Sequence, residues 1–153
     1  MISIMLVGCL ESPNDPTVEK GEFDFSVTYE INGEVKTVSG VYVCEYDGVS
    51  WALDGGPHRS WTGYCKGLED DLIRIGTTAD GQSIDLDLNL YPEYFMGDIE
   101  ENYREPSKPY IVVTVVGEDG GIGFAHEPDE VEELCGAKII SYTYEEPIVN
   151  SFD

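Results

Sequence analysis

Hydrophobic and polar residues alternate along most of the chain from Phe23 onward, which is the pattern of half-buried β-strands. The clearest strand is predicted over residues 23–31, where every second side chain is apolar or aromatic. Asn32-Gly33 follows it, and this pair is well suited to a two-residue type I′ hairpin turn. The turn sets a register with residues 34–46, in which Ile31 faces Glu34, Val27 faces Val38, Phe25 faces Gly40 and Phe23 faces Tyr42.

Gly40 interrupts the apolar face of the returning strand. A glycine inside a strand indicates a bulge or a bend. A one-residue bulge here would turn Val41 and Val43 inward in place of Val38, because a slip of one residue exchanges the two faces of a strand. The inward set of this strand therefore has two alternatives.

Asp-Gly steps divide the remaining strand pattern into hairpins. Asp47-Gly48 indicates a turn into a further strand, where Trp51 alternates with other apolar residues and is expected in the core. Asp80-Gly81 and Asp119-Gly120 indicate two more hairpins. Residues 110–116, before the last of these turns, are apolar on both faces and predict a strand buried on both sides.

One short helix is predicted over residues 128–136. Pro128 fits its first turn, acidic residues follow near its N-terminus, and Gly136 closes it. Alternation resumes over residues 137–144. The longest irregular segment is 91–109, and loops of this length in a compact domain are often functional or disordered.

About nine short strands and one helix in the C-terminal region predict an all-β, mainly antiparallel fold. We expect a β-sandwich, with an up-and-down β-barrel as the alternative. The chain of 153 residues is long enough to bury a substantial core. A single β-rich domain is predicted over residues 22–153.

The chain is strongly acidic, with 31 Asp and Glu against 8 Lys and Arg and a formal net charge of -23. Such a molecule repels phosphates, so nucleic acid is not an expected partner. The charge is interpreted mainly as a solubility device, and a specific cation-binding surface is the alternative. The oligomeric state does not follow from the sequence.

The sequence does not contain a recognisable catalytic or metal-binding motif. The four cysteines lack a C-x-x-C spacing, and Cys44, Cys65 and Cys135 are expected to be ordinary thiols or to form one disulfide. His58 and His126 have no nucleophile or acid beside them in a known arrangement. No catalytic residue, cofactor or metal site is therefore predicted.

Carboxylates form three local groupings. Asp85-x-Asp87-x-Asn89 has the opening spacing of a calcium loop but lacks the later ligands, and alternation with apolar residues favours a strand with a solvated acidic face. Glu69-Asp70-Asp71 and residues 98–101 are interpreted as solvated surface rather than as calcium sites.

Aromatic residues are the best candidates for binding, since aromatic rings stack on sugars and pack at protein interfaces. The group of candidates considered is Trp51, Trp61, Tyr64, Tyr91, Tyr94 and Phe95. Tyr91, Tyr94 and Phe95 stand at the start of the long irregular segment, and loops carry function disproportionately. These three are predicted to bind the ligand.

The sequence Leu6-Val7-Gly8-Cys9 resembles the lipobox of bacterial lipoproteins. The resemblance implies that Cys9 is lipidated, that residues 1–8 are the remnant of a signal peptide, and that residues 9–21 are the lipidated cysteine and a polar tether. It also implies an extracytoplasmic location on the cell membrane of a bacterium. The β-rich body is similar to small surface lipoproteins. The membrane would then be a partner through the lipid only.

Three functions remain open. The first is a non-catalytic, lipid-anchored extracytoplasmic domain that binds a cell-envelope protein, a glycan or a small ligand. The second is a small cell-envelope hydrolase that uses paired carboxylates. The third is a cytosolic β-domain in which the motif is accidental and Ile4, Leu6 and Cys9 alternate on a short strand.

Overall fold

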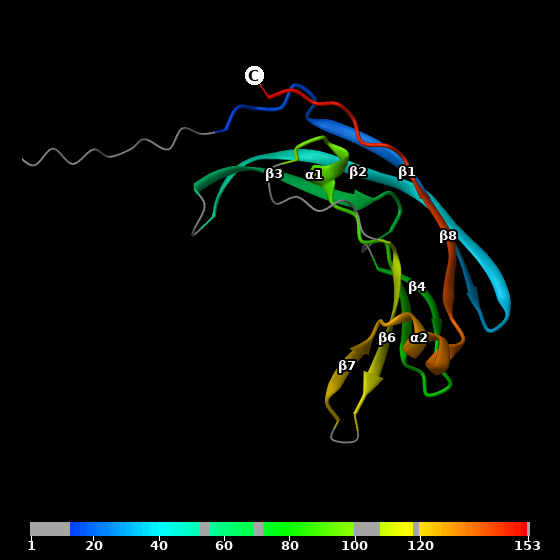
Figure 1. Ribbon diagram of the computed structural model, residues 1–153. Helices are drawn as coiled ribbons and strands as arrows, with labels where there is room; N and C mark the ends of the chain where they lie inside the picture. Colours follow the sequence, from blue (N-terminus) through cyan, green and yellow to red (C-terminus); the bar gives the residue numbers. More distant parts are fainter. Residues whose placement is uncertain (1–12, 53–55, 69–71, 100–107, 118–119, 153) are drawn as a thin grey trace, which may run out of the picture.

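The computed structural model describes residues 13–52, 56–68, 72–99, 108–117 and 120–152 (Figure 1). Two antiparallel sheets of four strands contain most of these residues, in the orders β3-β2-β1-β8 and β4-β5-β6-β7. We call them sheet 1 and sheet 2. Sheet 1 consists of β1 (Lys20–Ile31), β2 (Glu34–Ala52), β3 (Gly56–Cys65) and β8 (Lys138–Tyr144). Sheet 2 consists of β4 (Leu72–Thr77), β5 (Ser83–Asp87), β6 (Tyr110–Val116) and β7 (Ile122–Ala125). The all-β, antiparallel prediction is confirmed.

The β1–β2 hairpin has the predicted register. Asn32 and Gly33 have φ angles of 53° and 77°, as a type I′ turn requires. Phe25 pairs with Gly40, and the pairing continues without a shift from Ile31 to Lys20. A Cβ atom at Gly40 would lie 2.9 Å from Phe25 Cε1. Gly40 therefore makes room for the Phe25 ring, and the expected bulge at this position is absent.

The predicted turn at Asp47-Gly48 is wrong. β2 runs continuously through it, and the register with β3 shifts between Tyr46 and Val49, so the step is a bulge with Gly48 at φ 84°. The β2–β3 hairpin that results is long, and its end extends beyond the part of sheet 1 that packs on the core. Trp51 lies near its end and is 65% exposed, which contradicts its predicted place in the core.

The molecule has the shape of a hook (Figure 1). Sheet 1 curves over the top and down one side, and sheet 2 packs inside the curve against β1 and β8. Helix α1 (Pro92–Phe95) covers the inner face of β2 and β3. One continuous core joins these layers, formed mainly by alternate residues of the strands. Its largest fully buried side chains are Tyr42, Phe95, Ile84, Leu86, Leu88 and Met96.

Helix α2 (Pro128–Cys135) confirms the predicted helix. It begins at Pro128 and ends at Gly136, which has the left-handed φ of 62° that favours glycine at this position. Its buried Val131 faces the core, beside β6 and β8. The short helix α1 was not predicted, because four residues are too few to show a helical period.

The two ends of the described chain lie side by side. Thr17 N–H donates to Ser151 O at 2.8 Å, and Pro16 forms a β-bridge with Phe152. The folded part therefore begins near Asn14, before the predicted boundary at residue 22. The predicted lipidation residue, Cys9, lies outside the described residues.

Candidate functional site

The three predicted binding residues have different environments. Phe95 is 1% exposed and packs on Phe23 and Tyr42, so its ring is not available to a ligand. Tyr94 is half-buried and packs against the same core. Tyr91, 36% exposed, is the one of the three that lies on the surface.

Tyr91 lies beside a second feature, the outer face of sheet 2. This is the face turned away from the core, and it carries the alternate residues of β4 to β7. We define it by Leu72, Arg74, Asp85, Asp87, Tyr110, Val112, Thr114, Val116, Ile122 and Phe124, with His126 at the end of β7. The prediction that residues 110–116 are buried on both sides is wrong, since Ile111 and Val113 are in the core but Val116 is 53% exposed.

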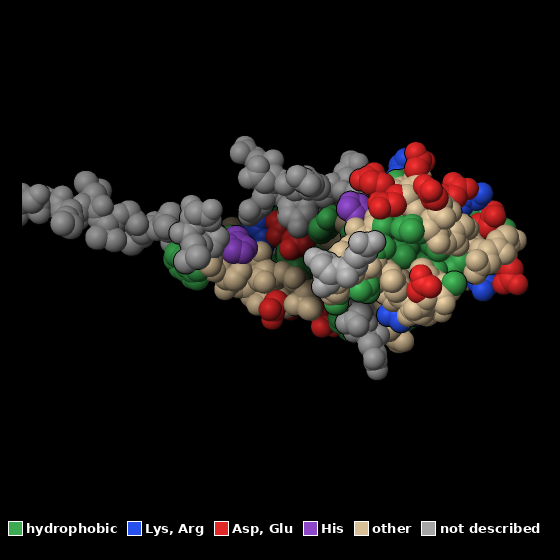
Figure 2. Space-filling view, turned by 90° about the horizontal axis from the view of Figure 1, so that it is seen from below, with side chains coloured by type: hydrophobic (Ala, Val, Ile, Leu, Met, Phe, Trp, Pro, Cys, Tyr) green, Lys and Arg blue, Asp and Glu red, His purple; other side chains and the backbone are tan. Residues whose placement is uncertain are grey.

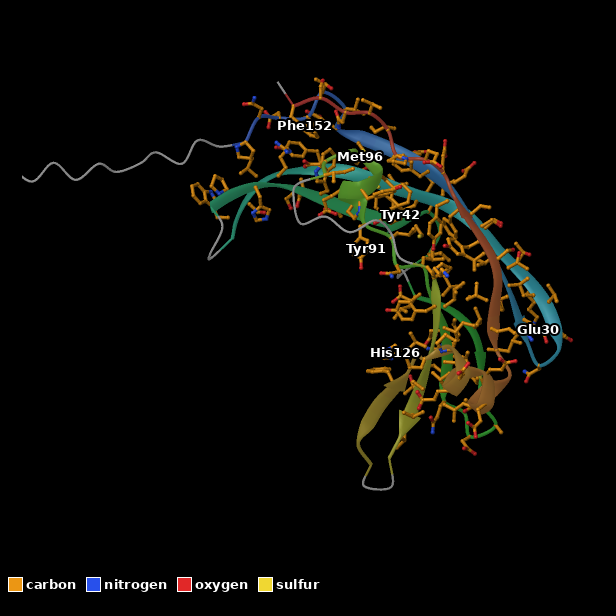
Figure 3. The ribbon with its side chains drawn as sticks, viewed as in Figure 1. Glu30, Tyr42, Tyr91, Met96, His126 and Phe152 are labelled. Carbon is orange, nitrogen blue, oxygen red and sulfur yellow. The ribbon has the colours of Figure 1, made fainter. Side chains whose placement is uncertain are left out.

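A groove of about 320 Å³ crosses this face. It is lined by Leu72, Asp87, Tyr110, Val112, Phe124 and His126. The Tyr110 and His126 rings meet edge to face, with centroids 6.3 Å apart. Tyr91 and His126 point toward the same open side of the molecule (Figure 3). We call this site the aromatic groove.

A chain of hydrogen bonds fixes the polar part of the groove. The Tyr110 hydroxyl donates to the Asp87 carboxylate. The backbone N–H of Asn89 donates to Asp87 Oδ1 at 2.8 Å, and the Tyr91 hydroxyl donates to Asn89 Oδ1 at 2.8 Å. The bond to Asp87, with some burial, raises the pKa of Tyr110 to about 12. Tyr110 therefore remains a neutral donor at physiological pH.

Exposed apolar side chains surround the groove. Leu72 is 49% exposed, Phe124 65% and Ile122 72%. Single exposed apolar residues are ordinary, but a contiguous group on one face marks an interaction surface. The outer face of sheet 2 has this property.

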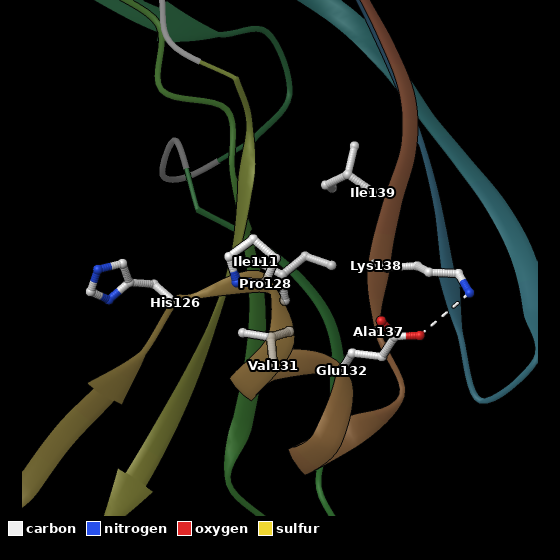
Figure 4. A pocket seen from close by; sticks show the side chains of 8 residues that line it. All are labelled: Ile111, His126, Pro128, Val131, Glu132, Ala137, Lys138 and Ile139. Carbon is white, nitrogen blue, oxygen red and sulfur yellow. Dashed lines mark ion pairs between the residues drawn. The ribbon is translucent and has the colours of Figure 1, made fainter.

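A smaller cavity lies on the other side of His126, between β6, α2 and β8 (Figure 4). Its volume is about 150 Å³, and its walls are mainly apolar, with Ile111, Val131 and Ile139 among them. Lys138 and Glu132 form an ion pair of 3.6 Å at its edge. Apolar cavities of about this size can hold a benzene-sized group.

The most buried charges belong to a structural cluster. The Arg59 guanidinium makes two bonds to Asp98, from Nε at 2.8 Å and from Nη2 at 2.6 Å, and Trp61 Nε1 donates to Asp98 Oδ2 at 2.8 Å. Arg59 also stacks on the Phe152 ring at 4.0 Å. The cluster thus fastens β3, the segment after α1 and the C-terminal segment together. Residues 69–71 and 100–101 of the predicted acidic groupings lie outside the described residues.

A Ser–His contact occurs on the long hairpin. Ser50 Oγ lies 2.8 Å from His58 Nε2, across paired positions of β2 and β3. Sequence spacing did not reveal this contact, because it depends on strand register. Neither residue lines the groove or the smaller cavity.

The thiols of Cys44 and Cys135 have the character of ordinary buried thiols. Burial raises the pKa of Cys44 to about 12 and also raises that of Cys135, whereas a reactive thiol needs a lowered pKa. In the described ranges, His, Cys, Asp and Glu do not gather in a group of three or more that could hold a metal ion. Neither α1 nor α2 is long and apolar enough to cross a membrane.

The strand predicted for the Asp85-x-Asp87-x-Asn89 spacing is confirmed for its first two positions only, since β5 ends at Asp87 and Asn89 follows it with a positive φ of 52°. Asp85 forms an ion pair with Arg74, and Asp87 accepts the two hydrogen bonds described above. Sequence reasoning missed the groove residues Tyr110, Phe124 and His126. The apolar character of both faces of residues 110–116 was the available indication, but it was interpreted as burial.

Comparison of the chain with known protein families, curated proteins and solved structures finds no match. The proposed function therefore rests on the sequence and on the geometry of the site.

Proposed function

We propose that this protein is a non-catalytic, lipid-anchored domain on the outer side of a bacterial cell membrane. It binds a partner of the cell envelope through the aromatic groove. The observation that carries the binding function is the group of exposed aromatic and aliphatic side chains around the groove. Without a partner these apolar side chains would remain in contact with water, and such a group on one face marks an interaction surface.

The arrangement of the chain favours this reading. The described chain begins at the top of the molecule, beside its C-terminal end, and the β6–β7 hairpin lies at the opposite end (Figure 1). A lipid on Cys9 would precede Pro13, the first described residue, by only four positions. The end near residue 13 would therefore face the membrane, and the outer face of sheet 2 would remain open to the envelope.

Binding explains the site better than carboxylate hydrolysis does. A glycoside hydrolase needs two carboxyl groups across one site, and its general acid has a raised pKa. Among the residues that the structure describes, one carboxyl group lines the aromatic groove, that of Asp87. Glu22 and Glu45 of sheet 1 have lowered pKa values, because Glu22 is bonded to Lys66 and Glu45 to Lys20.

The anchor is tested by expressing the full-length gene, with its upstream DNA, in a bacterium. Wild type is compared with Cys9→Ala by membrane partition and intact mass, and Cys135→Ala is the matched thiol control. We expect residues 1–8 to be lost and a lipid added in wild type and in Cys135→Ala. A soluble, unprocessed protein in all three cases would favour the cytosolic alternative and contradict the anchor.

The binding site is tested with the unanchored Cys9→Ala chain and isolated cell-envelope fragments. We expect the chain to co-sediment with the fragments and Phe124→Ser to abolish this. Val149→Ser is the control, since Val149 is 98% exposed and lies in the C-terminal segment. Equal loss in both variants, or no co-sedimentation of the parent chain, would contradict a site on sheet 2.

A further inference from the structure

We infer that the aromatic groove accepts a cationic side chain, an ammonium or guanidinium group, presented by a partner protein. The inference rests on the proposed function and specifies the ligand of the same site.

The polar end of the groove offers a carboxylate with unused acceptor positions. Asp87 accepts one hydrogen bond from the Tyr110 hydroxyl and one from the Asn89 backbone. A carboxylate has roughly four acceptor positions, so about two remain. Among the described residues no Lys or Arg forms an ion pair with Asp87, whereas Asp85 on the same face is paired with Arg74.

The walls of the groove suit the same ligand. Tyr110, Phe124 and His126 line it together with the aliphatic Leu72 and Val112. A cation over an aromatic face is attracted by the ring quadrupole, and the aliphatic part of a Lys or Arg side chain packs on apolar walls. An anion in the groove would be repelled by the Asp87 carboxylate.

The field of the whole molecule favours a cation over a neutral sugar. The net charge is -23, and in Figure 2 acidic side chains are spread along the visible face with few basic ones between them. Such a field raises the local concentration of cations and speeds their association. A neutral glycan gains nothing from it.

The surroundings of the groove indicate a protein rather than a small free cation. Ile122 and Val116 lie on the same face but outside the groove, and they are 72% and 53% exposed. A small cation would fill the groove and leave these side chains in water. A protein segment would cover them while one of its basic side chains enters the groove.

The test uses the full chain and two tripeptides that differ only in charge. One is acetyl-Leu-Arg-Leu-amide, and the other contains citrulline, the neutral isostere of arginine. Binding is followed by NMR shifts of backbone amides at physiological salt and neutral pH. We expect shifts in β5, β6 and β7 and roughly tenfold tighter binding of the arginine peptide.

Three variants identify the groups responsible. Asp87→Asn should reduce the affinity for the arginine peptide to that of the citrulline peptide. Asp80→Asn makes the same change of charge in the exposed β4–β5 turn and should leave the preference intact. Phe124→Ala, at an exposed position, should weaken both peptides.

The outcomes that would overturn the cationic ligand are distinct from those that would contradict the binding site. Equal binding of the two peptides in the groove overturns the cationic ligand and leaves the proposed function standing. The same holds if neither peptide binds but methyl β-glucoside or chitobiose shifts the groove residues. If none of these probes shifts them, the cationic ligand is overturned and the groove loses its support as the binding site.

Discussion

At the scale of single residues, the firmest feature is the buried Arg59–Asp98 pair. The side chains are 11% and 5% exposed, and the pair is completed by the Trp61 N–H and the Phe152 ring. Such a pair is not necessarily stabilising as a whole, but removing one partner leaves an uncompensated buried charge. Its role is to hold segments together that are far apart in the sequence.

Asp98→Asn should therefore destabilise the fold strongly. We expect the free energy of unfolding to fall by about 3 kcal/mol, because the Arg59 guanidinium loses its counter-charge in a buried place. Urea unfolding measures this change. Glu45→Gln breaks the exposed pair with Lys20 and should leave the urea midpoint nearly unchanged. Equal effects of the two substitutions would show that Asp98 is solvated.

At the scale of the elements, close contacts over glycine determine how the strands of sheet 1 pack. Tyr42 lies across Gly63 of the neighbouring strand, and a Cβ atom there would overlap the tyrosine hydroxyl. Tyr42 is 2% exposed and packs edge to face on Phe95, so it cannot move aside cheaply.

Gly63→Ala should lower the free energy of unfolding by about 1–3 kcal/mol, the usual cost of overpacking a core. The measurement is again urea unfolding. Gly123→Ala is the matched control in β7, where the added Cβ would lie 3.4 Å from Val115 Cγ2, near an ordinary contact distance. It should be neutral or slightly stabilising, since alanine restricts the unfolded chain more than glycine does. A stable Gly63→Ala would mean that Tyr42 has room to move.

Local elements were predictable where the interactions that define them are local. The Asn32-Gly33 turn fixed the β1–β2 register, and Pro128 and Gly136 marked the ends of α2. The prediction at Asp47-Gly48 was wrong because an Asp-Gly step is compatible with a hairpin turn and with a bulge. The pairing of β2 with β3, which involves residues up to Cys65, decides between them.

At the scale of the whole molecule, the net charge of -23 opposes the compact state through self-repulsion. Salt screens this repulsion, with a Debye length of about 8 Å at physiological ionic strength. Stability should therefore depend on ionic strength.

We expect the melting temperature to rise by about 2–4 °C between low salt and roughly 0.15 M NaCl, which corresponds to about 1 kcal/mol. Calorimetry measures it, and KCl should give the same rise if screening is the cause. A melting temperature that is constant or falls with salt would show that local ion pairs outweigh the general repulsion.

The sequence by itself determined most of the strands, the Asn32-Gly33 turn, helix α2 and the acidic character, because alternation, turn chemistry and charge are properties of neighbouring residues. Only the tertiary structure decided which apolar positions were left uncovered. Trp51 and residues 110–116 have the patterns of buried strands. Trp51 is nevertheless exposed, because the end of the β2–β3 hairpin extends beyond the core, and residues 110–116 are buried on one side only, because the core covers one face of sheet 2. The aromatic groove exists because of that incomplete cover. It unites residues from four strands whose spacing in the chain carries no information about their contact.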